Sequence, residues 1–321
     1  MTMLGRTANQ LYWMARYIER AENMARLIDV ANRMVLLDVP GQAQESVWGS
    51  TLEVAGYPED FVTFGGQISG ASAVLFLAFD DDFPSSIFSS VRAARENARA
   101  LRASITVEMW ESINSTWLEL RDYDSTSLFN GGVRDFCDWI KERTHSFRGV
   151  TDATMLRDES YAFLDLGLAI ERADNTARLV DSKYHVLLPR DEHVGGSVDY
   201  YQWGAVLRSL SAFRAYHKVY SDVIQPHRVA ELLLLRRDMP RSLMACFDRI
   251  TVQLDALCRG RPQECQRIAG EIHAGLRFGR IDGIIQQGLH EFLTRFIERN
   301  GELGMQIERD FMMLQRTGFH A

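Results

Sequence analysis

The chain has 321 residues, a formal net charge of −7, 46% hydrophobic residues and 25% charged residues. This balance is typical of a globular protein with a hydrophobic core. Lysines and arginines are mixed with acidic residues instead of forming a basic face, so we expect no nucleic-acid partner. The apolar runs are far shorter than the roughly 20 residues that cross a bilayer, and no signal-peptide pattern is visible. We therefore expect a cytoplasmic protein without a membrane span.

Two segments that lie 152 residues apart are nearly identical. Residues 18–29 read IERAENMARLID and residues 170–181 read IERADNTARLVD, so nine of twelve positions match. In the first copy, apolar residues recur at helical spacing from Met14 to Ile28. This spacing predicts an amphipathic helix in both copies.

A second, weaker repeat has an offset of 156 residues. Residues 76–87 read FLAFDDDFPSSI and residues 232–243 read LLLLRRDMPRSL, with Pro84 matching Pro240. An aspartate two residues before a proline predicts a helix start, because proline fits the first helical turn. No proline interrupts residues 85–120, which we expect to form one long helix.

Two matched segments in the same order indicate a duplicated unit. Sustained alternation of apolar and polar residues is nearly absent, which argues against strands. We predict an all-α helical bundle made of two related halves, residues 1–160 and 161–321, packed as one compact unit without significant sheet. Residues 39–70 are expected to form a loop.

The repeated segments share the polar pattern E-R-x-x-N-x-x-R, whose residues are Glu19, Arg20, Asn23, Arg26, Glu171, Arg172, Asn175 and Arg178. Glu, Asn and Arg at this spacing share one helix face. If the halves pack with pseudo-twofold symmetry, the two faces converge on a polar cleft. Its arginines would hold a carboxylate or phosphate, and its glutamates would accept a proton or bind Mg²⁺. The alternative is a buried network that only fixes the helix register.

A second group of residues follows the first proline, namely Arg95, Glu96, Arg99, Glu108, Trp110 and Glu111. It is interpreted as a partner- or anion-binding face with an aromatic anchor. The alternative is a solvated, salt-bridged helix whose tryptophan belongs to the core. Phosphate-binding glycine loops and the common metalloprotease and hydrolase motifs are absent from the sequence, so we expect no metal site and no cofactor of its own.

These segments together resemble the bacterial alpha-E family, uncharacterised helical proteins named for a recurring Glu-Arg motif. The resemblance covers essentially the whole chain. It includes LYWMARYIERAENMARLID, ARENAR, EMWESIN, AIERADNTARLVD and VDYYQW in the expected order. Phe83 departs from the pattern, which usually has a small polar residue before Pro84.

The resemblance implies a genomic association. Relatives are typically encoded beside, or fused to, a circularly permuted ATP-grasp ligase, with a transglutaminase-like and sometimes a proteasome-like peptidase nearby. We therefore expect a helical component of an ATP-grasp-linked system that forms or tags peptides, binding the ligase, its substrate or both. Mg²⁺ and ATP would enter only through the ligase. Two alternatives remain, an enzyme acting on the peptide or amide product through the Glu-Arg cleft, and a pure scaffold or oligomerisation module.

Overall fold

The computed structural model describes residues 3–36, 44–56, 68–123, 128, 132–186, 197–221 and 223–312. Within these residues all regular structure is helical, as the sequence predicts. The helices are α1 (Gly5–Leu36), α2 (Gln44–Val54), α3 (Gly70–Phe79), α4 (Ile87–Ala100), α5 (Val107–Arg121), α7 (Val133–Thr154), α8 (Glu159–Val186), α9 (Ser197–Ser209), α10 (Phe213–Tyr220), α11 (Pro226–Leu234), α12 (Leu243–Cys258), α13 (Glu264–Phe278), α14 (Ile281–Gln287) and α15 (Leu289–Ile307), followed by the π-helical turn η2 (Glu308–Met312). No helix in these ranges is long and apolar enough to cross a membrane.

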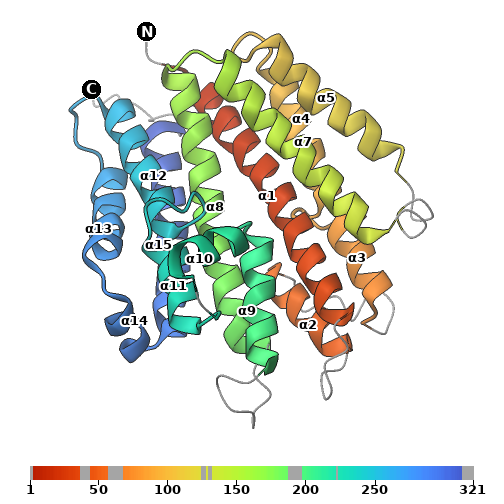
Figure 1. Ribbon diagram of the computed structural model, residues 1–321. Helices are drawn as coiled ribbons and strands as arrows, with labels where there is room; N and C mark the ends of the chain where they lie inside the picture. Colours follow the sequence, from red (N-terminus) through yellow and green to blue (C-terminus); the bar gives the residue numbers. More distant parts are fainter. Residues whose placement is uncertain are drawn as a thin grey trace.

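Helices α1 and α8 carry the two copies of the repeated segment and pack against each other in the middle of the molecule (Figure 1). Helices α4 and α7 pack on α1, whereas α12 and α15 pack on α8. The predicted apolar face of α1 is buried from Met14 to Ile28. Because neighbours cover α1 on several sides, polar residues of the same helix are buried as well, namely Glu19, Glu22, Asn23 and Arg26.

The backbones of the two central helices approach each other closely at Tyr12 of α1 and Gly167 of α8. A Cβ atom added to Gly167 would lie 2.2 Å from the carbonyl oxygen of Tyr12. Only glycine therefore permits this backbone approach, because real Cβ atoms do not sit so close to an oxygen. The contact fixes the position of α8 along α1 and with it the meeting of the two Glu-Arg motifs.

The weaker repeat adopts the same local geometry twice. Ser86 and Ser242 are the N-caps of α4 and α12. Each hydroxyl accepts a hydrogen bond from the backbone N–H three residues ahead and donates one to the carbonyl six residues behind. Pro84 and Pro240 lie two residues before these caps, so the prediction that proline occupies the first helical turn is wrong.

The prediction of one long helix over residues 85–120 is also wrong. The chain turns at residues 101–106 and continues as α5, which packs back on α4. Leu101 is buried at the turn, and the side chain of Thr106 caps α5 by accepting a hydrogen bond from the Met109 N–H. A stretch without proline can thus be divided into two helices, one ending at a buried leucine and the next starting at a threonine N-cap. The predicted loop over residues 39–70 contains α2.

Candidate functional site

The two Glu-Arg motifs meet where α1 and α8 touch, and they exchange ion pairs. Glu19 of α1 accepts two hydrogen bonds from the guanidinium of Arg172, at 3.0 and 2.8 Å. Glu171 of α8 accepts two from the guanidinium of Arg20, at 2.6 and 3.1 Å. Each glutamate therefore pairs with the arginine of the other copy, in the bidentate geometry that makes such pairs strong.

A second interaction is also repeated in both copies. Arg26 donates to Glu22 on α1 at 2.8 Å, and Arg178 donates to Asp174 on α8 at 2.6 Å. Both pairs span one helical turn, which brings the acid and the arginine onto the same face. Up to this point the two copies have equivalent contacts.

The surroundings of Glu19 form a closed cluster of charges. Arg148 of α7 and Arg241, which precedes α12, donate hydrogen bonds to both Glu19 and Glu22. The Glu22 carboxylate also accepts a hydrogen bond from the Thr144 hydroxyl at 3.0 Å. Both glutamate side chains are fully buried. We call this group the ion cluster; its members are Glu19, Glu22, Arg26, Arg148, Arg172 and Arg241.

The ion cluster contains more positive than negative charge. Burial would raise the pKa of Glu19, but Arg172 and Arg241 outweigh it and lower that pKa to about 2. The pKa of Glu22 is likewise well below its ordinary value. Burial lowers the pKa of Arg241 to about 10, although the charges of Glu22 and Glu19 act in the opposite direction. The cluster therefore sets four guanidiniums against two ionised carboxylates.

The surroundings of Glu171 are open instead. A cleft of about 370 Å³ lies between α1, α8, α15 and the end of α2. We call it the Glu171 cleft; its polar lining includes Arg16, Arg20, Asn23, Glu171, Asn175 and Arg178. Burial would raise the pKa of Glu171, but Arg20 and Arg16 outweigh it and lower that pKa to about 2. This carboxylate is an ionised hydrogen-bond acceptor, fully engaged by two guanidiniums.

Two equivalent asparagines of the Glu171 cleft have unused hydrogen-bonding groups. Nδ2 of Asn23 and Oδ1 of Asn175 are buried and have no hydrogen-bond partner among the described residues. Buried amide groups without a partner are rare because they lose their hydrogen bonds to water. A ligand with both donor and acceptor atoms would supply the missing partners.

The charge of the Glu171 cleft favours a monoanion. Three guanidiniums, those of Arg16, Arg20 and Arg178, face two carboxylates, those of Glu171 and Asp174. The guanidinium of Arg16 is held 4.4 Å from the ring centre of Trp13, a favourable cation–π distance. One positive charge is left over, which matches a single carboxylate group.

The eight residues predicted to share one cleft are divided between two places. Glu19, Arg26 and Arg172 belong to the ion cluster, whereas the other five line the Glu171 cleft. Sequence reasoning did not include Arg16, Glu22, Arg148 and Arg241. Arg241 stands opposite Ser85 in the aligned repeats, a difference that was visible in the sequence, and Ser85 lines the Glu171 cleft.

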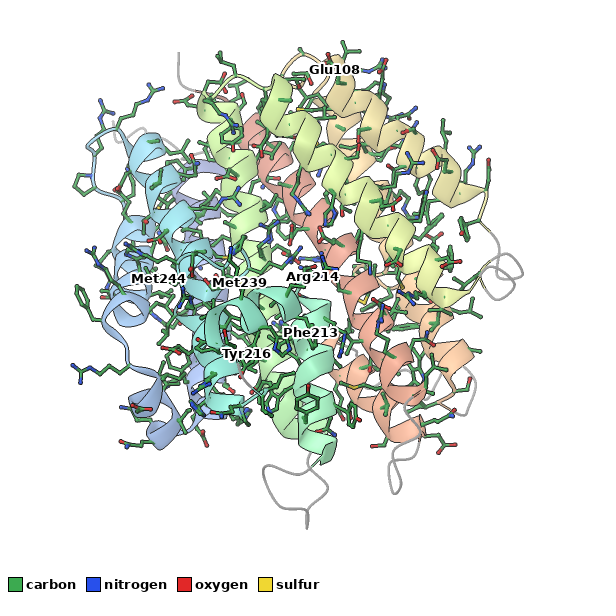
Figure 2. All side chains as sticks on the ribbon, in the orientation of Figure 1. Glu108, Phe213, Arg214, Tyr216, Met239 and Met244 are labelled. Atoms are coloured by element: carbon green, nitrogen blue, oxygen red, sulfur yellow. The ribbon has the colours of Figure 1, made fainter. Side chains whose placement is uncertain are left out.

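The second predicted group lies on α4 and α5, away from both places. Arg95 donates to the Asn114 side chain at 3.0 Å, and Glu96 pairs with Arg95 and Arg99. The guanidinium of Arg102 covers the half-buried Trp110 ring at 4.3 Å. Glu108, at the rim of the molecule in Figure 2, and Glu111 are exposed. These contacts match the solvated, salt-bridged alternative, and a partner-binding role for this face stays a prediction.

Comparison with known proteins places the whole chain in one family. The profile of Alpha-E, described as a predicted alpha-helical domain with a conserved ER motif, matches residues 3–312. Uncharacterised proteins of Mycobacterium bovis and of two Mycobacterium tuberculosis strains are each 25% identical over 276 residues, covering 78% of this chain. The chain spans about 30% of the length of these curated relatives. No solved structure matches.

Proposed function

The chain belongs to the Alpha-E family, and we propose that it is the non-catalytic helical component of an ATP-grasp-linked system that forms or tags peptides. In this role it binds the ligase and presents a carboxylate-bearing substrate in the Glu171 cleft. It has no cofactor of its own, and Mg²⁺ and ATP belong to the ligase. The transglutaminase-like and proteasome-like peptidases are further partners under this proposal, and the compartment is the cytoplasm.

The proposal rests mainly on two features of the Glu171 cleft. Its lining has one excess positive charge, and amide atoms of Asn23 and Asn175 have no hydrogen-bond partner among the described residues. An ATP-grasp ligase activates a carboxylate and joins it to an amine. A peptide brings both a carboxylate and amide donors and acceptors, so it would satisfy the charge and the asparagines together.

Binding is favoured over catalysis by the ionisation of Glu171. An effective proton acceptor at neutral pH needs a pKa close to 7. Arg16 and Arg20 instead lower the pKa of Glu171 to about 2, which makes its carboxylate a very weak base. The alternative, an enzyme that acts on the peptide or amide product through this glutamate, would have to release both arginines first.

The first experiment is affinity purification of the tagged protein from its host, with mass spectrometry of what co-elutes. We expect a stoichiometric ATP-grasp protein. Substrate-dependent ADP release by that ligase would then be measured alone, with the wild-type protein and with a Ser85→Phe variant whose side chain fills the Glu171 cleft.

The wild-type protein should stimulate the ligase, and Ser85→Phe should still co-elute but fail to stimulate. If the purified protein alone turns over the product, the enzyme alternative replaces the proposal. If the wild-type protein and Ser85→Phe stimulate the ligase equally, the protein is a scaffold and the Glu171 cleft has no role in substrate binding.

A further inference from the structure

The ion cluster has two positive charges that no carboxylate within it balances. The side chains of Arg26, Arg172 and Arg241 are more than nine-tenths buried. Buried charge without a counter-charge is costly, so an opposite charge is expected close by. On the side of α9, Arg26 is the member of the cluster that also contacts Ser209 and Ser211.

Arg26 connects the ion cluster to a second cleft. Its Nη1 donates to the Ser209 carbonyl at 2.6 Å and to the Ser211 hydroxyl at 2.9 Å. Arg26 and Ser211 line a cleft of about 580 Å³ between α1, α7 and the junction of α9 with α10. We call it the Arg26 cleft. His145 also lines it, and the Nε2 atom of His145 lies 3.3 Å from the Glu22 carboxylate.

The lining of the Arg26 cleft is itself cationic. It contains five cationic side chains, Arg26, Arg33, Lys141, Arg208 and Arg214, and three carboxylates, Asp29, Asp138 and Glu142. Asp29 is paired with Arg33 and Lys141, and Lys141 also pairs with Asp138. In the described part of the chain no carboxylate pairs with Arg208 or Arg214, so two guanidinium forks remain available to a ligand.

The backbone at the start of α10 adds further donors. The N-cap residue Ala212 has no side chain to cap the helix, so the first N–H groups of α10 lack a side-chain acceptor. Phe213 and Arg214 lie at this helix start (Figure 2), and the Phe213 ring supports the guanidinium of Arg208 at 4.1 Å. Ser211 has a φ angle of +55° and ends α9 as its left-handed cap, with the Ser211 N–H bonded to the Arg208 carbonyl and the Ala212 N–H to the Leu207 carbonyl.

We propose that the Arg26 cleft binds a phosphate group, held by Arg208, Arg214 and the start of α10 in front of Arg26 and the ion cluster. Arg208 and Arg214, the two cations of the cleft with no carboxylate partner among the described residues, together match the charge of a phosphate dianion, whose tetrahedral oxygens suit guanidinium forks and backbone N–H groups. A carboxylate carries only half of this charge. The Arg26 cleft shares no lining residue with the Glu171 cleft of the proposed function.

The test measures binding of inorganic phosphate and of phenyl phosphate to the full chain by calorimetry and thermal unfolding, with chloride at matched ionic strength as reference. The variant is Arg208→Gln with Arg214→Gln. Its control is Arg99→Gln with Arg157→Gln, which removes the same charge from exposed positions elsewhere. Ser211→Gly is a third variant, since glycine accepts the positive φ angle while the hydroxyl is removed with its Cβ.

We expect saturable binding to the wild type, at least tenfold weaker binding to Arg208→Gln with Arg214→Gln, and a change of less than twofold in the control. Ser211→Gly should fold normally and bind several-fold more weakly. Equal affinity for both phosphates identifies the phosphate group of a larger ligand, whereas binding of inorganic phosphate alone identifies the free ion. Absence of saturable binding, or equal affinity in the double variant, overturns the proposal.

Discussion

Glu19 and Glu171 occupy matching positions in two nearly identical segments, yet their surroundings are opposite. Each accepts a bidentate pair from the arginine of the other copy. Around Glu19, Arg148 and Arg241 fill the remaining space and leave a closed ion cluster. Around Glu171, Ser85 takes the place of Arg241 in the aligned repeats, and a cleft stays open. The shared motif therefore joins the helices, and residues from outside it decide which copy is structural and which can take a ligand.

The largest expected effect is on the closed copy. Glu19→Gln leaves four guanidiniums, three of them buried, facing one carboxylate, so we expect a loss of about 3–5 kcal/mol in the free energy of unfolding. Glu171→Gln should cost clearly less, because Arg16 and Arg20 are partly exposed to the cleft and water can solvate them. Urea unfolding of both variants measures the difference. Equal losses would contradict the contrast between a closed and an open copy.

Both glutamates also make stability depend on pH. Their folded-state pKa of about 2 lies below the ordinary 4.5, so their stabilisation is complete above about pH 4.5 and is lost as the pH falls towards 2. Each glutamate contributes at most roughly 3 kcal/mol to the free energy of unfolding, and this contribution is lost between about pH 4.5 and pH 2. Urea midpoints measured from pH 6 to pH 3 should fall, and Glu171→Gln should fall less steeply than the wild type. A urea midpoint that does not change with pH would contradict the ion pairs of Glu19 and Glu171.

The contact that brings the two copies together is tested at Gly167. Gly167→Ala places a Cβ against the Tyr12 carbonyl and should cost about 1–3 kcal/mol by pushing α8 from α1. Gly149→Ala is the matched control, because it is exposed on α7 with open space around its Cβ. It should stabilise by about 0.5–1 kcal/mol, since alanine is the better helix former. Thermal unfolding shifts of the same sign would refute this interpretation.

The smallest effect is expected on the solvated face. Arg99→Gln removes an exposed pair with Glu96 and should change the free energy of unfolding by less than about 0.5 kcal/mol. It should also leave co-elution of the ligase unchanged. Loss of co-elution in this variant would place the partner-binding surface on α4 and α5.

The helical fold class could be predicted from the sequence because the patterns that indicate helices are local. The spacing of apolar residues on α1, and the repeat of that segment on α8, are each visible within a few helical turns. The prediction of one long helix failed at residues 101–106, where α4 ends at the buried Leu101 and the Thr106 side chain caps the start of α5. Burial depends on which helices pack there, and that is not encoded in the segment itself.

The site was accessible only in part. The two copies of adjacent Glu and Arg identified the motif residues, but their meeting in space followed only if pseudo-twofold packing was assumed, and the sequence does not show that packing. The division into a closed and an open copy was not predicted, because Arg148 and Arg241 reach Glu19 from 129 and 222 residues away in the chain. The replacement of Arg241 by Ser85 in the aligned repeats was the one sequence signal of this difference.

The most direct measurement uses Asn175→Leu in the open copy. Calorimetry would compare binding of a tripeptide mixture with free carboxylates and of the same tripeptides amidated, to the wild type and to this variant, alongside urea unfolding. We expect the wild type to bind only the free carboxylates, and Asn175→Leu to lose binding while its stability stays equal or rises, because it removes an unpartnered buried oxygen. Unchanged binding together with lower stability would show that Asn175 serves the fold and that the Glu171 cleft is not a ligand site.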